Sequence, residues 1–464
     1  MNGRKSQSLA LLPEFYVDFD GSPRFGSISI GSDGVLEFDQ DGKDAPSVIR
    51  LKNQAVLPGF VNCHSHVFQR VLRGIAEPKS PGGDFWTWRD MMYASVKNMT
   101  KDVFQAIAEL TYYEMLEAGF THVGEFHYLH HDLTSFSEPL AMSRALFHAA
   151  NKVGINLCLL ECAYHQNSFS LPLAAEQSRF AFPTVSQFLG FLQNANDEFS
   201  NNDFVSVGCA IHSVRAVPEA WFLPINDFAL AHNMPLHIHV SEQTQENEEC
   251  LTATGCSPIG LLRRNHLLAP HATLVHVTHL INDDLELLSR SGRPHICICP
   301  STEKNLGDGI VPLASLMKQK LPICIGSDQH VRLDPFCEAR SLEELERLRL
   351  KRRGILNETG GYFYQPLLAS LTKFGLSSLY PTDTHTSLRG QKANLVVVTL
   401  PPEYEWHGPE AALNTIMLTY HPAMITHVMV NGEFVIQSGS VITEEKQYLI
   451  KELKSFLKTL HYQN

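Results

Sequence analysis

Histidines and an aspartate at the ends of separate apolar runs have the residue types and spacing of a metal site. His64 and His66 lie two residues apart, so on an extended strand both imidazoles project from one side and can reach one cation. One histidine of the pair His237 and His239 could supply a third nitrogen ligand, and Asp328 could supply an oxygen. Three nitrogens and one carboxylate suit Zn²⁺ or Fe²⁺ and leave a position for water.

Each of these signals is weak by itself. A single His-x-His pair is common, His239 could be a hydrogen-bonded histidine at a strand end, and Asp328 could be a helix N-cap. Their occurrence together, each at the end of its own apolar run, is much harder to explain unless they bind one metal ion.

An acidic residue and a further histidine could perform chemistry beside such a metal. A divalent cation lowers the pKa of a bound water, and the resulting hydroxide attacks a planar carbon such as C=O or C=N. Glu242, three residues after His239, could carry the proton from water to the leaving nitrogen. His276 or His279 could polarise the attacked group or hold the water. The sequence therefore predicts metal-assisted hydrolysis at carbon, with the choice between these two histidines open.

Eight apolar runs that end in polar residues indicate how these side chains are positioned. Helical patterns, such as those at 100–118 and 218–232, separate the runs, and this alternation predicts a distorted (β/α)₈ barrel of the TIM type. In that fold the carboxyl ends of all strands share one rim, so residues distant in sequence converge there. The predicted strands are 61–66, 121–127, 156–162, 205–212, 236–242, 273–279, 295–300 and 323–328.

Both ends of the chain carry a different, strand-rich pattern. Alternating runs at 27–31 and 34–38 are separated by a turn signal, and runs at 393–398 and 427–435 include a turn at Asn431-Gly432. We therefore predict an α/β protein whose barrel, residues 58–385, accompanies a small β-sandwich domain built from residues 1–57 and 386–464, the latter including a terminal helix.

Composition narrows the class of protein. The 464 residues carry 37 Lys and Arg against 49 Asp and Glu, a net charge of −12, which argues against binding to nucleic acid or an anionic membrane. No apolar stretch is long enough to span a bilayer, and the apolar run at 9–12 is too short for a secretory signal. The ten cysteines form no CxxC motif. These features predict a cytoplasmic protein with reduced thiols.

The pattern as a whole resembles the mononuclear deaminase branch of the amidohydrolase superfamily. The segment from Pro58 to His66 and the His-x-x-Glu of residues 239–242 carry the resemblance, together with His276 and Asp328. The resemblance implies that the metal ligands are His64, His66, His239 and Asp328, and that the catalytic residues are Glu242, His276 and Asp328. It also implies a homodimer and one Zn²⁺ per chain, with Fe²⁺ possible. No lysine follows the fourth strand, where two-metal relatives carry a bridging one.

Further segments resemble one family within that branch, the formimidoylglutamate deiminases of histidine degradation. These enzymes hydrolyse N-formimidoyl-L-glutamate to N-formyl-L-glutamate and ammonia. The resemblance implies a substrate pocket, and its arginines suit the two carboxylates of such a substrate. The segments are 68–70, 85–93, 125–132, 212–217 and 301–309, and the pocket residues are Gln69, Arg89, Tyr128, His212 and Arg215.

Two alternatives remain at this point. A deaminase of purine, pyrimidine or related rings would keep the same ligands and Glu242, but its pocket would need aromatic stacking and no paired arginines. A catalytically dead barrel that serves as a scaffold would have lost ligands, whereas this chain keeps a full set. Arg89 could also be a surface arginine stacked on Trp86 or Trp88, and Tyr128 could serve only in packing.

Overall fold

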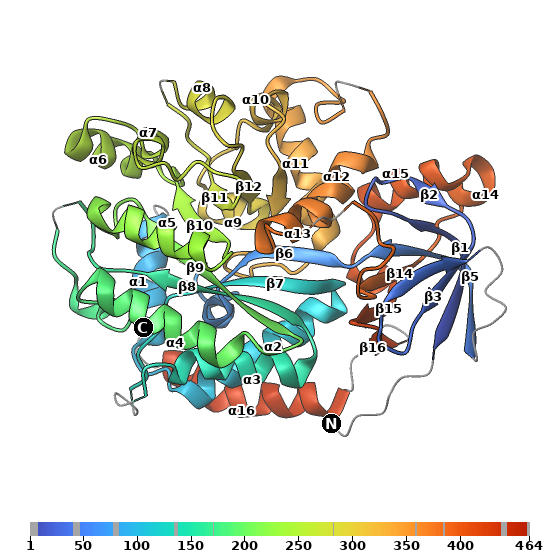
Figure 1. Ribbon diagram of the computed structural model, residues 1–464, viewed down its shortest axis with the longest axis horizontal. Helices are drawn as coiled ribbons and strands as arrows, with labels where there is room; N and C mark the ends of the chain where they lie inside the picture. The colour runs from blue at the N-terminus through green and yellow to red at the C-terminus, as the bar shows by residue number, and fades with distance from the viewer. Residues whose placement is uncertain are drawn as a thin grey trace.

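Two separate β-sheets organise the chain, one in a barrel and one beside it (Figure 1). This computed structural model describes residues 8–39, 47–77, 83–133, 138–169, 171–281, 283–357, 360–383, 386–437 and 443–461. The predicted α/β fold, a TIM-like barrel with a small β domain made from both chain ends, is confirmed.

Eight parallel strands form the barrel, and each one coincides with a predicted apolar run. They follow one another in chain order around the sheet. The ring closes where the backbone N–H of Asp328 donates to His64 O at 2.9 Å and that of His66 donates to Asp328 O at 3.2 Å. The strands are β6 (Phe60–Ser65), β7 (Phe120–His127), β8 (Asn156–Ala163), β9 (Val205–Ser213), β10 (Leu236–Val240), β11 (Ala272–His276), β12 (His295–Ile298) and β13 (Ile323–Ile325).

Helices cover the outside of this barrel, which explains why its strands are apolar on both faces. Of the predicted helical segments, 100–118 becomes α2 and 218–232 becomes η3 with α5. The elements are η1 (Val67–Leu72), α1 (Phe85–Val96), α2 (Lys101–Glu117), α3 (Ala141–Val153), η2 (Ala175–Gln177), α4 (Val185–Phe199), η3 (Glu219–Trp221), α5 (Phe222–Ala231), α6 (Thr244–Thr254), α7 (Pro258–Arg264), α8 (Asp284–Ser289), α9 (Pro300–Leu306), α10 (Leu313–Lys318), α11 (Pro335–Leu350), α12 (Tyr364–Leu371) and α13 (Lys373–Leu379).

The second sheet joins the two chain ends. Its path runs β16-β15-β14-β5-β1-β3-β4, with β2 paired to β1, so N- and C-terminal strands meet where β14 lies antiparallel to β5. This continuous sheet is the form taken by the predicted β domain. Its strands are β1 (Leu9–Val17), β2 (Pro23–Arg24), β3 (Ser27–Ile30), β4 (Leu36–Asp39), β5 (Ser47–Pro58), β14 (Leu395–Thr399), β15 (Ile425–Val430) and β16 (Glu433–Gln437).

The remaining C-terminal helices take two positions. Helices α14 (Glu403–His407) and α15 (Pro409–Thr419) and the turn η4 (Pro422–Met424) lie between β14 and β15 in the sequence. The terminal helix α16 (Thr443–His461) instead packs along the barrel helix α2, where Lys446 pairs with Glu117 (Figure 1).

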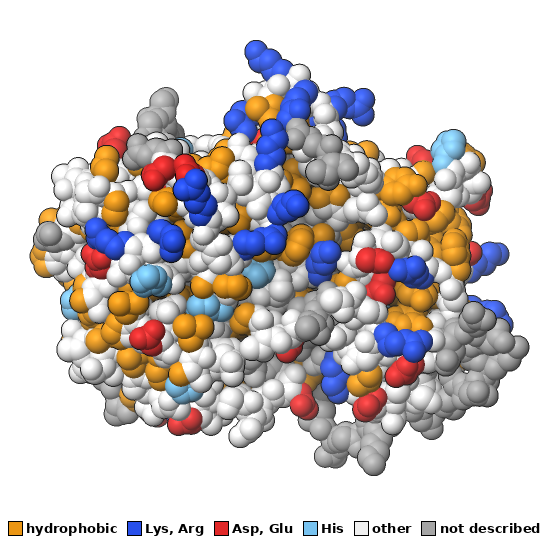
Figure 2. Space-filling model, turned by 45° about the horizontal axis from the view of Figure 1, so that its top comes forward, with side chains coloured by type: hydrophobic (Ala, Val, Ile, Leu, Met, Phe, Trp, Pro, Cys, Tyr) orange, Lys and Arg blue, Asp and Glu red, His pale blue; other side chains and the backbone are white. Residues whose placement is uncertain are grey.

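The surface and the thiols bear on the composition-based predictions. Figure 2 shows one face, on which basic and acidic side chains lie among apolar ones. None of the helices in the described part of the chain has the length and apolar character needed to cross a membrane. The apolar run at 9–12 forms the start of β1, and residues 1–7 lie outside the described residues. All ten cysteines are described, and all are free.

Candidate active site at the carboxyl rim of the barrel

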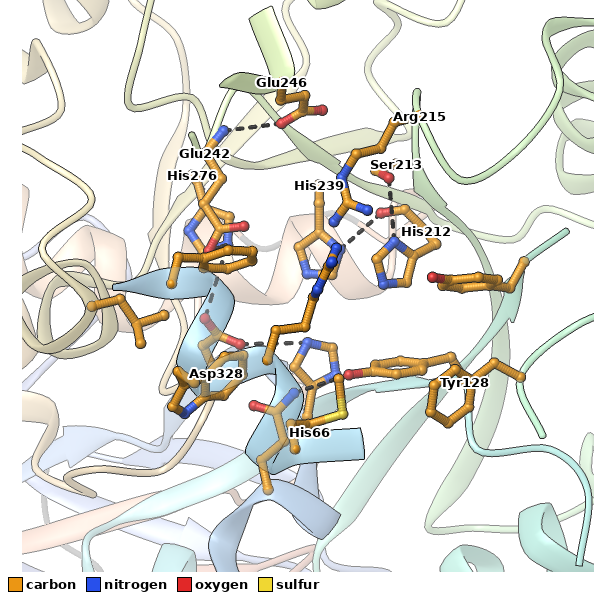
Figure 3. A pocket seen from close by; sticks show the side chains of 18 of the residues that line it. His66, Tyr128, His212, Ser213, Arg215, His239, Glu242, Glu246, His276 and Asp328 are labelled. Atoms are coloured by element: carbon orange, nitrogen blue, oxygen red, sulfur yellow. Dashed lines mark hydrogen bonds and ion pairs between the residues drawn. The ribbon is translucent and has the colours of Figure 1, made fainter. Parts of the chain in front are cut away.

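A pocket opens at the carboxyl ends of the barrel strands, where the sequence placed the site (Figure 3). Its lining comes from strands β9, β10 and β11, from the segments that follow the other strands of the barrel, and from η1, α1, α6 and α9. The lining residues are His66, Gln69, Phe85, Trp88, Arg89, Met92, Tyr93, Tyr128, Tyr164, Phe180, His212, Ser213, Arg215, His239, Glu242, Glu246, His276, Leu306 and Asp328.

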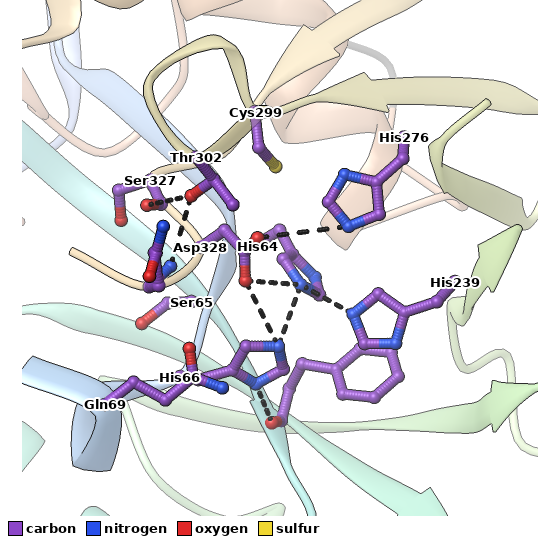
Figure 4. A network of polar contacts seen from close by, with 12 residues as sticks. His64, Ser65, His66, Gln69, His239, His276, Cys299, Thr302, Ser327 and Asp328 are labelled. Atoms are coloured by element: carbon purple, nitrogen blue, oxygen red, sulfur yellow. Dashed lines mark hydrogen bonds and ion pairs between the residues drawn. The ribbon is translucent and has the colours of Figure 1, made fainter. Parts of the chain in front are cut away.

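Three histidines and one aspartate converge at the floor of this pocket (Figure 4). His64 Nε2 lies 3.0 Å from the Nε2 atoms of both His66 and His239. Asp328 Oδ1 lies 3.5 Å from His64 Nε2 and 3.4 Å from His66 Nε2. The structure therefore brings together all four residues that the sequence grouped around one cation.

The hydrogen bonds of the Nδ1 atoms determine whether the Nε2 atoms of these histidines have a free lone pair. Nδ1 of His66 donates to the carbonyl of Phe126, and Nδ1 of His239 donates to the carbonyl of His212, each at 2.8 Å. Burial lowers the pKa of His64, His66 and His239, which favours their neutral forms. A neutral imidazole that donates through Nδ1 has a bare lone pair on Nε2.

These bare lone pairs fit a cation. Two Nε2 acceptors face His64 Nε2, which can donate a proton to only one of them. Carbonyl partners on Nδ1 are the usual arrangement that orients histidine ligands. The donor set of this structure therefore suits a divalent ion, with Asp328 as the oxygen donor.

Glu242 and His276 lie next to this group. His276 Nε2 is 3.6 Å from Glu242 Oε1 and 3.9 Å from Asp328 Oδ2, while its Nδ1 is 3.4 Å from Glu303 Oε1. Burial opposes protonation of His276, but the carboxylate of Glu242 and the hydrogen bond to Glu303 raise its pKa well above its usual range. Burial raises the pKa of Glu242. The imidazole of His276 and the carboxylate of Glu242, two groups that can exchange protons, are thus held side by side over the pocket floor.

The geometry also decides between the two pairs of histidines that the sequence left open, His237 or His239 and His276 or His279. His237 lies on β10 beside His239, but its Nε2 donates to the carbonyl of Ser378 at 3.2 Å, away from the pocket. His279 Nε2 contacts the carbonyl of Asp308 at 2.8 Å. Only His239 and His276 of these two pairs line the pocket.

The backbone at the rim is unusually strained. Ser241, His276, Val277 and Asp328 all have positive φ, between 48° and 75°. This region is unfavourable for residues with a side chain, above all for the β-branched Val277, and such strain concentrates at functional sites. Here it turns the chain sharply as strands β10, β11 and β13 end, and His276 and Asp328 point into the pocket (Figure 3).

All five residues proposed for substrate binding line the same pocket. Gln69 Nε2 donates to the hydroxyl of Tyr128 at 3.0 Å, and the ring of Tyr128 meets His212 edge-on at 5.2 Å. Arg215 is buried and donates to the carbonyl of Asn167 at 3.4 Å. Arg89 stacks on Trp86, with its guanidinium carbon 4.4 Å from the ring centroid, so the anticipated stacking and the pocket position occur together.

Sequence reasoning missed several residues of this site, although signals for them existed. Tyr164 directly follows β8, as Tyr128 directly follows β7, so it occupies an equivalent rim position. Tyr93 lies four residues after Arg89 on α1, hence on the same helix face. Glu246 lies in the first turn of α6, and its carboxylate accepts from the backbone N–H of Glu242 at 3.3 Å. Burial raises the pKa of Glu246 to about 7. No local pattern distinguished Phe180, which lies in an irregular segment.

Comparisons with known proteins agree with the fold. Residues 55–435 match the Amidohydrolase family. The chain is 34% identical to a formimidoylglutamate deiminase of Pseudomonas aeruginosa over 94% of its length and 95% of that protein. It is 23% identical to a 5-methylthioadenosine/S-adenosylhomocysteine deaminase of Lawsonia intracellularis over 92% and 91% of the two chains. A solved structure of an amidohydrolase from Brucella melitensis superposes with a TM-score of 0.87 at 27% identity, covering 98% of this chain and all of that one.

With a family match over most of its length and a relative above 30% identity, the chain belongs to the amidohydrolase family of hydrolases.

Proposed function

We propose that this enzyme hydrolyses N-formimidoyl-L-glutamate to N-formyl-L-glutamate and ammonia, a step of histidine degradation. The supporting relative is the Pseudomonas aeruginosa deiminase. The observation that carries the proposal is Arg215, a guanidinium with 9% exposure that lines the pocket and forms no ion pair within the described residues. The carboxylates of Glu246 and Glu242 act on Arg215 through space without contacting it. A buried cation is costly without a directly paired counter-charge, and a substrate carboxylate would provide one.

The proposed metal site consists of His64, His66, His239 and Asp328, holding one divalent cation, with Zn²⁺ the first candidate and Fe²⁺ the second. Such an ion, when bound, acidifies water and polarises a C=N bond. Imidazole nitrogens suit both metals, so the choice rests on metal analysis.

The proton chemistry falls to the acidic residue and histidine beside that site. Glu242 accepts a proton from the attacking water and delivers it to the imine nitrogen as the C–O bond forms, which gives a tetrahedral adduct. It then moves the proton of the new hydroxyl to the same nitrogen, so that the C–N bond breaks, ammonia leaves and the formyl C=O forms. His276, 3.6 Å from Glu242, orients the reacting carbon and is itself held from behind by Glu303. Each of these groups lines or borders the pocket, so no movement of a distant element is required.

The other end of the pocket would hold the glutamate part of the substrate. Arg89 and Arg215 supply positive charge, and Gln69, Tyr128 and His212 supply hydrogen-bond donors. Like Arg215, Arg89 forms no ion pair among the described residues, and its buried Nε has no hydrogen-bond partner there. Two guanidinium groups without carboxylate partners match a substrate with two carboxylates.

Arg215→Ala is expected to raise KM at least 10-fold, roughly the effect of losing one charge-assisted hydrogen bond, with a smaller effect on kcat. The reason is that a remote carboxylate is bound equally in the ground and transition states. Steady-state kinetics on N-formimidoyl-L-glutamate measure this, with exposed Arg263→Ala as the matched control. An unchanged KM would remove Arg215 from the substrate site.

A second candidate is deamination of a nucleoside or free base. The relative from Lawsonia intracellularis and the aromatic lining by Trp88, Tyr93, Tyr128 and Tyr164 favour it, because rings of bases stack on such side chains. Ammonia release from N-formimidoyl-L-glutamate, 5-methylthioadenosine, adenosine, guanine and cytosine distinguishes the two. Turnover of a ring substrate without turnover of the amidine would overturn our proposal.

On the same family resemblance we propose a homodimeric protein of the cytoplasm. The proposed division places the barrel at residues 58–385, with residues 1–57 and 386–464 forming the second domain. Light scattering of the purified chain tests the dimer, and a monomeric mass would contradict it.

A further inference from the structure

A second group of potential metal ligands lies behind the wall of the pocket. His127 ends strand β7, Glu161 lies on the adjacent strand β8, and the strand register pairs these two residues directly. His130 follows three residues after His127, and a nitrogen or oxygen from each of the three lies within 4.8 Å of the others. All three side chains are buried, with exposures of 1%, 1% and 0%.

This group is separate from the active site, although it adjoins it. Side chains alternate along a strand, so His127 projects from β7 on the side opposite Tyr128, which faces the pocket (Figure 3). None of His127, His130 and Glu161 lines that pocket. The cluster of His127, His130 and Glu161 and the ligands of the active site thus lie on opposite sides of β7.

The atoms that face one another in this second cluster have no hydrogen-bond partners among the described residues. His130 Nε2 donates to the carbonyl of Cys162 at 2.8 Å, which leaves its Nδ1 as a bare lone pair. That Nδ1, the Nε2 of His127 and the carboxylate oxygens of Glu161 have no hydrogen-bond partner among the described residues. His130 Nδ1 and Glu161 Oε2 are 3.5 Å apart, which is too long for a normal hydrogen bond.

Apolar surroundings make these unpaired polar atoms energetically unfavourable unless an ion is bound. The ring of Phe104 stacks on His127 at 5.6 Å, and Phe182 and Phe191 pack against His130 at 4.9 and 5.1 Å. Unpaired polar atoms in such an apolar shell are costly. Burial raises the pKa of Glu161 to about 8, although the neighbouring Ser143 opposes the shift. One shared proton could join Glu161 to His130, but His127 Nε2 would remain without a partner.

We propose that His127, His130 and Glu161 bind a second divalent cation of the Zn²⁺ class, which fixes the start of the segment after β7. Two imidazoles and a carboxylate are ligands of this class of ion. The carbonyl partner of His130 and the aromatic shell are the supports that metal ligands usually have. The ion would join β7, β8 and the segment from Tyr128 to His130, and so would hold Tyr128 in position at the pocket.

Metal analysis of the full-length protein tests this proposal without any assay of turnover. After growth with zinc and gel filtration, wild type is expected to contain about two metal ions per chain, and Glu161→Gln and His127→Asn about one. His239→Asn in the proposed catalytic site should also contain one, and the double variant Glu161→Gln with His239→Asn none. The matched control is Glu109→Gln, because Glu109 is equally buried but already paired with Lys152.

The outcomes separate this proposal from that of the active site. A wild-type chain with one ion that is lost in His239→Asn would overturn the second site and leave the catalytic one intact. A chain whose single ion is lost in Glu161→Gln would support the second site and contradict the first. If Glu161→Gln does not fold, as judged by circular dichroism, the wild-type count and the His127→Asn count still decide the question.

Discussion

Glu242→Gln is expected to lower kcat on the order of 10³-fold while the metal content stays at the wild-type value. Glutamine keeps the size and polarity of the side chain but cannot accept and return a proton. In the structure, Glu242 is the carboxylate nearest to His276 Nε2 at 3.6 Å, and it points into the pocket (Figure 3). Ammonia release under saturating substrate, with metal analysis on the same preparation, measures the effect.

The control for this variant lies on the same stretch of chain. Glu248 is exposed on α6, so Glu248→Gln changes the charge by the same amount without touching the pocket. We expect wild-type kinetics for it. A Glu242→Gln enzyme with unaltered kcat would show that another group transfers the proton, and Glu246, four residues further, would then be the next candidate.

His239→Asn is expected to abolish stoichiometric metal at the pocket and to reduce activity by more than about 100-fold, the upper range for losing only an outer partner of a metal ligand. The reason is that His239 Nε2 and His66 Nε2 each lie 3.0 Å from His64 Nε2, so the three nitrogens can share one ion. Because the shorter asparagine cannot reach the same point, the site would keep two histidines and Asp328. Metal analysis and ammonia release measure both effects.

Strand β10 offers a closely matched control for this prediction. His237 is buried two residues earlier and donates to the carbonyl of Ser378 instead of facing the pocket. His237→Asn removes an imidazole from the same strand, so it should cost stability but keep the pocket metal. Equal loss of metal in both variants would mean that the effect comes from damage to the strand and not from a lost ligand.

Much of this architecture could be predicted from the sequence because one physical rule relates the eight apolar runs to one another. Polar residues that end apolar strands must share a rim once a parallel barrel closes, so His64, His239 and Asp328 could be grouped despite their separation. Strands β10 and β11 end earlier than predicted, at Val240 and His276, because the chain turns there at the positive φ of Ser241, His276 and Val277. Hydrophobic pattern marks a strand but carries no information on such turns.

Other features depend on tertiary contacts that no local pattern contains. His237 and His239 lie two residues apart on the same strand, so both have the same local pattern in the sequence. They are distinguished by a tertiary contact, because His237 donates to the carbonyl of Ser378. The terminal helix α16 is amphipathic, but nothing in its sequence specifies that it lies along α2. The pairing of His127 with Glu161 similarly depends on strand register.

The most direct measurement is the rate of ammonia release from N-formimidoyl-L-glutamate by the chelator-treated protein before and after Zn²⁺ or Fe²⁺ is restored. The account predicts almost no release from the treated protein, recovery on addition of one of these ions, and no recovery in His239→Asn. Undiminished release after the pocket metal has been removed, or no release from the fully loaded protein, would contradict it.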